Sequence, residues 1–260
     1  GAVSSFLAQH PRELRNYTMK GSSVAVVSDG SAVLGLGNIG PAGALPVMEG
    51  KCLLFKKFAN IDAVPIVLAT QDIGEIVRTV KAISPAFGGI NLEDIAAPRC
   101  FEIEARLKRE LSIPVMHDDQ HGTAIISAAA LLNAVEIAGK SLSKVKIVVN
   151  GAGASAISCA KLYLSLGAKK ENLLMLDSKG ALSIDRDDLD ENKKFFAVKT
   201  KIKDLKEAMK GADVFVGLSK GNVVTKEMVQ SMAKDAIVFA LANPDPEIPY
   251  EEAASAREDI

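Results

Sequence analysis

The sequence predicts an α/β protein made of two domains, the first over residues 1–121 and the second over residues 122–260. Two observations carry this prediction. Short apolar segments rich in β-branched residues alternate with amphipathic helical segments in both halves, which indicates parallel or mixed sheets covered by helices. The second half repeats strand, helix and strand at short intervals, which predicts an open parallel sheet with right-handed crossovers. The 260 residues provide enough chain for two domains.

The expected elements of the first domain begin with a helical segment over residues 1–20, broken at His10-Pro11. Residues 24–28 and 32–36 are β-branched or apolar and flank Asp29-Gly30, so we expect them to form a hairpin. Beyond the hairpin, strands are expected at residues 64–69, 87–92 and 113–116, and helices at 42–58, 72–83 and 98–110.

The second domain is expected to follow an alanine-rich helix over residues 122–138 that ends at Gly139 and crosses between the domains. A charged stretch over residues 185–201 is expected to be a loop. The remaining strands are expected at residues 145–150, 173–177, 213–218 and 236–242, and the helices at 154–166, 204–210 and 226–233.

Composition excludes several classes of function. The net charge is −1 with both signs mixed along the chain, so no basic surface for nucleic acid or anionic membrane is predicted. The three cysteines lie far apart and fit neither a zinc motif nor a disulfide framework, which suits the cytoplasm. Residues 31–48 are uncharged, but their glycines and prolines would break a membrane-spanning helix. No leader peptide is visible, so we expect a cytoplasmic protein.

A glycine-rich turn at residues 148–156 closes an apolar strand and opens a helix, and it fits the pattern G-x-G-x-x-A. Gly151 makes the tight turn, Gly153 lets the backbone approach a pyrophosphate, and Ala156 permits close helix packing. The backbone from Gly151 through Ala152, Gly153 and Ala154 to Ser155 would then face the phosphates. This arrangement predicts a Rossmann-type dinucleotide-binding domain.

The choice between NAD and NADP depends on the next strand, which ends at Asp177. An acid at this place usually binds the adenosine ribose hydroxyls and repels a 2′-phosphate, so Asp177 favours NAD. Basic residues nearby could instead pair with a 2′-phosphate, which keeps NADP as the alternative. These residues, together with a serine beside them, are Ser178, Lys179, Lys193 and Lys194.

A second glycine-rich run, Gly35 to Gly40, imitates the same motif. It lacks a following strand that ends in an acid, and Pro41 comes directly after it. We expect a close backbone approach there that shapes the floor of an active site.

Two acidic pairs, Glu93-Asp94 and Asp118-Asp119, follow expected strands of the first domain. Strand ends of this kind can converge at one sheet edge, where carboxylate oxygens without nearby cysteine suit Mg²⁺ or Mn²⁺. The alternative is that these acids only cap the helices that follow them.

Two further residues are candidates for chemistry. Lys51 lies in an apolar helical segment and, close to a metal, could act as a general base, although locally it reads as a surface lysine. Asn243 ends a buried strand and could reach a substrate or a nicotinamide ribose, or could simply begin a turn with Pro244.

Six segments of the chain are distinctive: YTMKGSSVAVVSDGSAVLGLGNIGP, PVMEGKCLLFK, FGGINLEDIAAPRCFEIE, PVMHDDQHGTA, VVNGAGASA and VFALANPDPEIP. They closely resemble the malic enzymes, especially the short bacterial form, and the resemblance covers nearly the whole chain in family order. The resemblance implies a homodimer that oxidises (S)-malate and decarboxylates the product to pyruvate and CO₂, with reduction of NAD or NADP. Its partners would be small molecules only, namely malate, oxaloacetate and pyruvate.

The resemblance also implies roles for single residues. Glu93, Asp94 and Asp119 correspond to ligands of Mn²⁺ or Mg²⁺. Lys51 matches the catalytic base, and Asp118 would assist as a partner of the metal or of Lys51. The residues that match the cofactor site are Gly151, Ala152, Gly153, Ala154, Ser155, Asp177 and Asn243.

The chain departs from the family pattern at both ends. The family's catalytic tyrosine lies in a Y-T-P-G motif that would fall at or before Gly1, so Tyr17 is given a structural role. A later asparagine-rich substrate segment would follow Ile260, and we therefore expect the chain to be part of a longer protein. Two alternatives to the oxidative reaction are an oxaloacetate decarboxylase of the same family and a catalytically silent dinucleotide-binding regulator.

Overall fold

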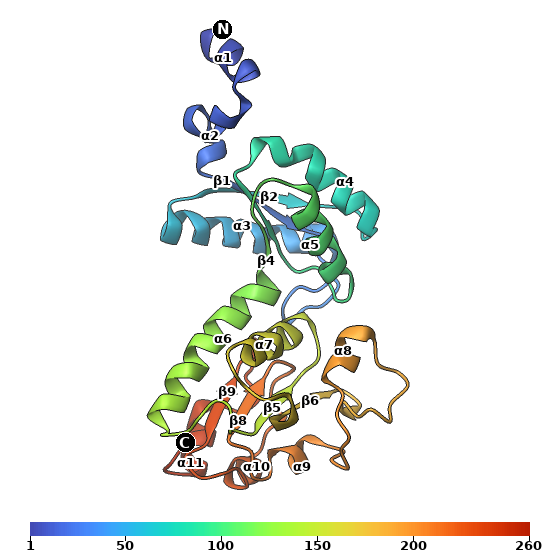
Figure 1. Cartoon of the computed structure of the whole chain (residues 1–260), viewed down its shortest axis with the longest axis vertical. Coiled ribbons are helices and arrows are strands. Elements are labelled where there is room, and N and C mark those ends of the chain that lie inside the picture. The colour runs from blue at the N-terminus through green and yellow to red at the C-terminus, as the bar shows by residue number, and fades with distance from the viewer. The chain divides into compact units, whose positions relative to one another are not determined.

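The computed structural model describes all 260 residues, and its contacts divide the chain into two compact units, Gly1–Asp119 and Gln120–Ile260 (Figure 1). The sequence placed this division after residue 121. Each unit contains one sheet of mainly parallel strands with helices around it, so the predicted α/β fold class is confirmed. None of the helices combines the length and the apolar composition that a membrane span needs.

The sheet of the first unit has four parallel strands in the order β2-β1-β3-β4. The two inner strands are buried along most of their length, which explains their continuous apolar sequences. The strands are β1 (Ser23–Ser28), β2 (Asp62–Val67), β3 (Gly89–Leu92) and β4 (Val115–His117).

Helices connect these parallel strands. Helix α3 (Gly40–Ala59) packs against β1 and β2, while α4 (Ile73–Ile83) packs against α5 (Arg99–Glu110). Asp72 caps α4 by accepting a hydrogen bond from the Glu75 amide at 2.8 Å. The apolar face of α4 that the spacing predicted is buried.

The N-terminal segment forms α1 (Ala2–Gln9) and α2 (Leu14–Tyr17), as predicted, with the break at His10-Pro11. Tyr17 is 55% exposed, and its ring lies 5.4 Å from that of Phe6. Its role here is to pack the two short helices together. Short 3₁₀ turns occupy Pro11–Glu13, Met19–Gly21, Ser84–Ala86 and Lys170–Asn172.

The predicted hairpin of residues 24–28 and 32–36 is wrong. Both edges of β1 are taken by parallel partners, β2 and β3, so no edge remains for an antiparallel neighbour. Residues 32–36 instead form a tight loop in which the Gly37 amide donates to the Val33 carbonyl at 2.8 Å. Gly35 and Gly37 have φ angles of 76° and 74°, which only glycine adopts readily.

Two other elements of the first unit differ from expectation. The strand predicted at residues 64–69 is the half-buried edge strand β2, which begins at Asp62 and tolerates Pro65 because it lies at the edge. The helix predicted from residue 122 is α6 (Asp118–Ile137). Asp118 and Asp119 therefore lie in its first turn rather than in a loop.

The second unit has a five-stranded sheet in the order β7-β6-β5-β8-β9, in which only β7 is antiparallel to its neighbour. The first strand of the unit, β5, lies at the centre of the sheet. The chain adds β6 and β7 on one side of it and then β8 and β9 on the other, so the strand order switches at β5. The strands are β5 (Ile147–Asn150), β6 (Leu173–Asp177), β7 (Gly180–Ala181), β8 (Val214–Gly217) and β9 (Ile237–Ala240).

Helices of the second unit are α7 (Ala154–Ser165), α8 (Glu191–Phe196), α9 (Leu205–Met209), α10 (Lys226–Gln230) and α11 (Tyr250–Ala256). The loop predicted at residues 185–201 is wrong in part, because it contains α8. Asp190 caps this helix by accepting from the Asn192 and Lys193 amides, and Phe196 anchors it with 1% exposure. The charged residues around Phe196 hid this single apolar anchor from the sequence pattern.

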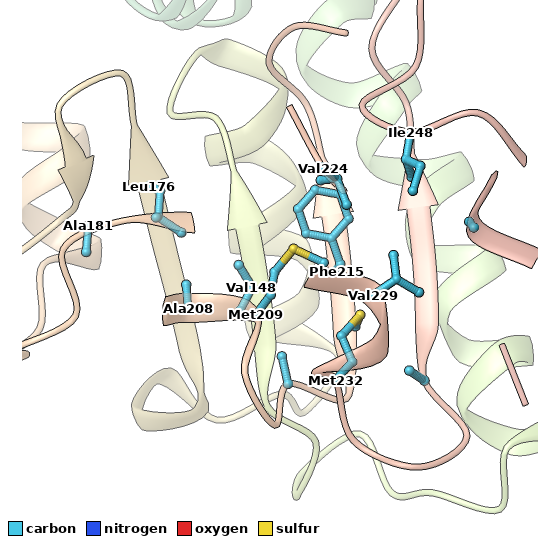
Figure 2. Packing of buried hydrophobic residues seen from close by; sticks show 13 residues of the cluster. Val148, Leu176, Ala181, Ala208, Met209, Phe215, Val224, Val229, Met232 and Ile248 are labelled. Atoms are coloured by element: carbon cyan, nitrogen blue, oxygen red, sulfur yellow. The ribbon is translucent and has the colours of Figure 1, made fainter. Parts of the chain in front are cut away.

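A hydrophobic cluster fills one side of this sheet (Figure 2). Phe215 of β8 lies beside Met209 of α9, and neither is exposed. Val224, just before α10, and Ile248, just before α11, close the cluster toward the carboxyl ends of β8 and β9. This packing fixes the sheet edge at which the loops of a dinucleotide site begin.

Candidate metal and dinucleotide sites

The four acidic residues meet at one edge of the first sheet because β3 and β4 are neighbours. Leu92 pairs in register with His117, so the residues that follow these two strand ends lie side by side. Asp94 has a φ angle of 54°, and its amide donates to Asp119 Oδ2 at 3.0 Å. One oxygen each of Glu93, Asp94 and Asp119 lies within 4.8 Å of the other two.

Lys51 reaches this acidic group from α3. Its Nζ lies 2.9 Å from Glu93 Oε1 and 2.7 Å from Asp118 Oδ2. Glu93 Oε1 also accepts from Asn91 Nδ2 at 2.7 Å. Local sequence alone favoured a surface lysine, and that interpretation suits Lys56 instead, which forms an exposed pair with Asp62.

Burial dominates the electrostatics of the acidic group. It raises the pKa of Glu93 to about 7, against the opposing effect of Lys51, and it raises the pKa of Asp94 to about 7 with help from the charge of Asp119. Burial also raises the pKa of Asp119. For Lys51, burial favours the neutral amine, but Asp118 and Glu93 outweigh it and raise its pKa above the usual value. Without a metal, Lys51 therefore serves as the counter-charge of the group.

The three carboxylates fit a divalent cation. Opposite oxygen ligands of Mg²⁺ lie about 4.2 Å apart, twice the usual bond length of about 2.1 Å. The separations of up to 4.8 Å need only a small inward movement. A cation of this kind would relieve the crowding of negative charge that raises the carboxyl pKa values. Helix capping alone does not explain Asp119, whose carboxylate accepts from Asp94 across the sheet edge.

A buried polar cluster that the sequence analysis missed fixes the segment after Asp94. Asp29 is 1% exposed and accepts from the Ser31 amide and from Arg99, both at 3.0 Å. Ser31 Oγ in turn accepts from the Ala96 amide at 2.9 Å. The only signal in the sequence was the Asp-Gly pair after the first strand, which reads as an ordinary turn.

The glycine-rich turn of the second unit has the geometry that phosphate binding requires. Gly151 has a φ angle of 130°, and a side chain there would strike the Leu218 carbonyl. Gly153 precedes α7, and no side chain caps the first amides of this helix. Those amides are free to face an anion. Ala156 is fully buried, as close helix packing requires.

Asp177 ends β6 and is already engaged. Arg186 forms two hydrogen bonds with its carboxylate, at 2.8 and 2.9 Å, and Lys193 approaches Oδ2 at 3.2 Å. These partners lower the pKa of Asp177 despite its burial. The sequence analysis missed Arg186 because it lies in a stretch interpreted as a loop. Lys179 and Lys194 pair elsewhere, with Asp188 and Glu191.

The loop that follows β9 carries Asn243, which is exposed. A buried residue in this loop, Glu247, escaped the sequence analysis. Its side chain accepts hydrogen bonds from the Ser219 and Ala242 amides, both at 3.0 Å. The motif that drew attention to Asn243 contains Glu247, but a glutamate after two prolines gives no sign of being buried.

The second glycine-rich run, Gly35 to Gly40, closes onto the end of β1. The Ile39 and Gly40 amides both donate to the Gly30 carbonyl at 3.1 Å. A side chain at Gly30 would overlap the Gly40 backbone, so this is the close backbone approach that was predicted. Its place in an active-site floor stays a prediction.

Taken together, the second sheet, its central strand and the uncapped glycine turn define a class: an α/β protein with a Rossmann-type dinucleotide-binding unit. Comparison with known proteins narrows the class. Residues 4–72 and 69–108 match the family model described as malic enzyme, N-terminal domain, and residues 120–256 match that of malic enzyme, NAD binding domain. The chain belongs to the malic enzyme family.

Individual relatives agree with this assignment. The chain is 57% identical to the bifunctional malic/malolactic enzyme of Bacillus subtilis, covering 93% of this chain and 60% of that protein. It is 54% identical to the NAD-dependent malic enzyme of Geobacillus stearothermophilus, covering 95% and 52%. The crystal structure of the NAD-dependent malic enzyme from Thermotoga maritima has a TM-score of 0.93 and 48% identity, covering 98% of this chain and 69% of that one. The chain thus spans about 60% or less of the length of these two curated relatives.

Proposed function

We propose that the protein catalyses the metal-dependent oxidative decarboxylation of (S)-malate to pyruvate and CO₂, with reduction of NAD(P). One observation carries the proposal beyond family membership: Lys51 Nζ contacts both Glu93 and Asp118 within the cluster of carboxylates. A proton acceptor beside a candidate metal site is what the oxidation of a 2-hydroxy acid requires.

Glu93, Asp94 and Asp119 would hold Mn²⁺ or Mg²⁺. When bound, the cation supplies Lewis-acid stabilisation of negative charge on the C2 oxygen of the substrate. With the negative charge of the carboxylates taken up by a bound cation, the neutral amine of Lys51 would be favoured. Its Nζ would then take the proton of the C2 hydroxyl as hydride passes from C2 to the oxidised nicotinamide. Asp118 accepts a hydrogen bond from Nζ at 2.7 Å, and it would orient the amine before this transfer and stabilise the ammonium after it.

The dinucleotide would lie along the carboxyl edge of the second sheet. Residues Gly151, Ala152, Gly153, Ala154 and Ser155 would bind the pyrophosphate through backbone amides at the start of α7. Asn243, which follows β9, would contact the nicotinamide side of the cofactor. Asp177, the last residue of β6 on the other side of β5, would bind the adenosine ribose.

We propose NAD as the preferred cofactor, because Asp177 presents a carboxylate where the ribose hydroxyls bind. Arg186 and Lys193 lie on this carboxylate and could also hold a 2′-phosphate. NADP is therefore the alternative. Relatives of this chain include both NAD-dependent and NADP-dependent malic enzymes, so family membership supports either cofactor.

The test is absorbance of the reduced nicotinamide, measured on the full-length protein with (S)-malate, Mn²⁺ and either NAD or NADP. The key variant is Lys51→Ala, and the matched control is Lys56→Ala, which removes an exposed lysine from the same helix. We expect a signal that requires Mn²⁺, survives in Lys56→Ala and is lost in Lys51→Ala.

Two other outcomes would replace the proposal. Release of CO₂ from oxaloacetate that requires metal, without any reduction of NAD or NADP by malate, would favour an oxaloacetate decarboxylase. Binding of the dinucleotide without either reaction would favour a silent regulator. The homodimer and the cytoplasmic location implied by the family resemblance also stay predictions, and light scattering on the purified protein tests the first of them.

A further inference from the structure

We propose that Glu247 is a positioning residue that holds the two loops beneath the nicotinamide half of the cofactor in place. These loops follow β8 and β9, and Glu247 connects them through its carboxylate. The inference rests on the proposed binding of a dinucleotide by this unit, and it adds a residue to which neither family nor sequence motif assigned a role.

The carboxylate of Glu247 is fully buried and divides its two oxygens between the loops. Oε1 accepts from the Ser219 amide at 3.0 Å, and Oε2 accepts from the Ala242 amide at 3.0 Å. No lysine, arginine or histidine forms an ion pair with it. A buried carboxylate without a cation is unfavourable unless its hydrogen bonds are satisfied, so both amides are needed to keep it there.

The backbone around Glu247 strengthens this connection. Its carbonyl accepts from the Val223 and Val224 amides, both at 3.0 Å. The next residue, Ile248, is anchored in the hydrophobic cluster beside Val224 (Figure 2). The carboxylate therefore projects from a fixed point toward two loops that are themselves exposed at Ser219 and Asn243.

Strand order shows which part of a dinucleotide these loops would face. The pyrophosphate turn follows the central strand β5, and Asp177 ends β6 on one side of it. The half of the cofactor that does not bind at β6 must extend over β8 and β9. Ser219 follows β8, and its Oγ accepts from Asn150 Nδ2 at 2.8 Å, which joins the loop to the residue before Gly151.

The site accepts a carboxylate better than any other group. A β-carbon on Gly217, the last residue of β8, would overlap the Glu247 carboxylate, so glycine is required at that position. Glutamine has nearly the shape of glutamate but only one oxygen. Its NH₂ group would face a backbone N–H, and one of the two loops would be released. An apolar side chain could fill the same volume but would hold neither loop.

The experiment compares Glu247→Gln with Glu251→Gln, a matched change at an exposed glutamate four positions further along. Calorimetry measures the affinity of the full-length protein for NAD and for ADP-ribose, which lacks the nicotinamide. We expect Glu247→Gln to bind NAD about tenfold more weakly, which is the size of one lost hydrogen bond to a charged group, and ADP-ribose within about twofold of wild type. Glu251→Gln should change neither affinity.

Three results would overturn the inference. If Glu247→Gln leaves both affinities unchanged, the carboxylate does not position the loops. If it weakens both ligands equally, Glu247 only supports the fold of the unit. If the wild-type protein binds neither NAD nor ADP-ribose, the proposed function fails and the inference fails with it. The wild-type titration shows this without the variant, so the two failures can be distinguished.

A second measurement needs no substitution and so does not depend on a variant that folds. Hydrogen exchange of the wild-type protein should find the Ser219 and Ala242 amides protected, although the loops around them are exposed. Rapid exchange at both amides would refute the connection that Glu247 is inferred to make. In the folded variant, kcat should fall more than the KM for malate changes, because the loops lie on the cofactor side.

Discussion

Removal of the Lys51 ammonium should lower the free energy of unfolding of the metal-free protein. Lys51 pairs with Glu93, whose side chain is 5% exposed, and with Asp118, whose side chain is 31% exposed. Breaking a fully buried pair costs about 3–5 kcal/mol, and an exposed pair is worth at most about 1 kcal/mol. Because these pairs lie between the two limits, we expect Lys51→Ala to lower the stability of the first unit by about 2 kcal/mol.

The same substitution should strengthen the binding of Mn²⁺. In the metal-free protein Lys51 occupies Glu93 Oε1 at 2.9 Å, so a cation entering the site competes with an ammonium for that oxygen. Without Lys51, Glu93 loses its ion-pair partner, and the basic group that still faces the cluster is His117, whose Nε2 lies 3.7 Å from Asp119 Oδ2. We expect Mn²⁺ to bind about tenfold more tightly to Lys51→Ala, although the variant should be inactive with malate.

Thermal unfolding in the presence of EDTA, followed by titration with Mn²⁺ at about pH 8, measures both effects. The loss of about 2 kcal/mol corresponds to a fall of about 8 °C in the Tm of a unit of this size. Lys56→Ala, which breaks an exposed pair worth at most about 1 kcal/mol, should lower the Tm by no more than about 4 °C. Equal Tm values for the two variants, or a larger Mn²⁺ stabilisation in wild type than in Lys51→Ala, would refute this account of Lys51.

Three further predictions concern the two sites. Burial raises the pKa of Glu93 and Asp94 to about 7, so below that pH Mn²⁺ must displace protons from these carboxylates. The affinity for Mn²⁺ should therefore be highest above about pH 7 and fall below it by up to about tenfold per pH unit for each proton displaced. Calorimetry at several pH values checks this. Gly151→Ala places a side chain at a φ angle of 130° and against a carbonyl, so it should destabilise the second unit by about 2 kcal/mol and abolish the binding of ADP-ribose. Arg186→Ala removes the cation that pairs with Asp177, so the ratio of NADP to NAD affinity should fall, and titration of the variant with both cofactors would contradict this if the ratio were unchanged.

Much of the fold could be predicted because its signals are local. The helix at Ile73–Ile83 shows its apolar spacing and its Asp72 cap in the sequence, and the strand that ends at Asp177 is a plain apolar run. The glycine turn at Gly151 was equally readable, because only a few residue types satisfy its φ angle and its packing. Such features depend on neighbours within a few positions.

The features that sequence could not predict depend on distant contacts. Whether residues 32–36 form a strand depends on whether β1 has a free edge, and that is decided by residues 62–67 and 89–92. Lys51 and Asp118 are 67 positions apart, so no local pattern connects them, and only the family resemblance suggested Asp118 as a partner of the metal or of Lys51. Glu247 is an acid in a polar, proline-rich segment, and its burial follows from a sheet built by residues 147–240.

The acidic pairs follow directly after β3 and β4, and this determines which insertions the first unit can tolerate. The separation of Asp94 and Asp119 is set by the register of β3 against β4, in which Leu92 lies opposite His117. The connection at residues 111–113 enters β4 from the opposite end of the sheet and contributes nothing to that register. Insertions there should leave the carboxylates at the same spacing, whereas a slip of one residue in β4 would turn His117 outward and dismantle the cluster. The spacing of these carboxylates is therefore insensitive to the length of that loop and depends on the pairing of β3 with β4.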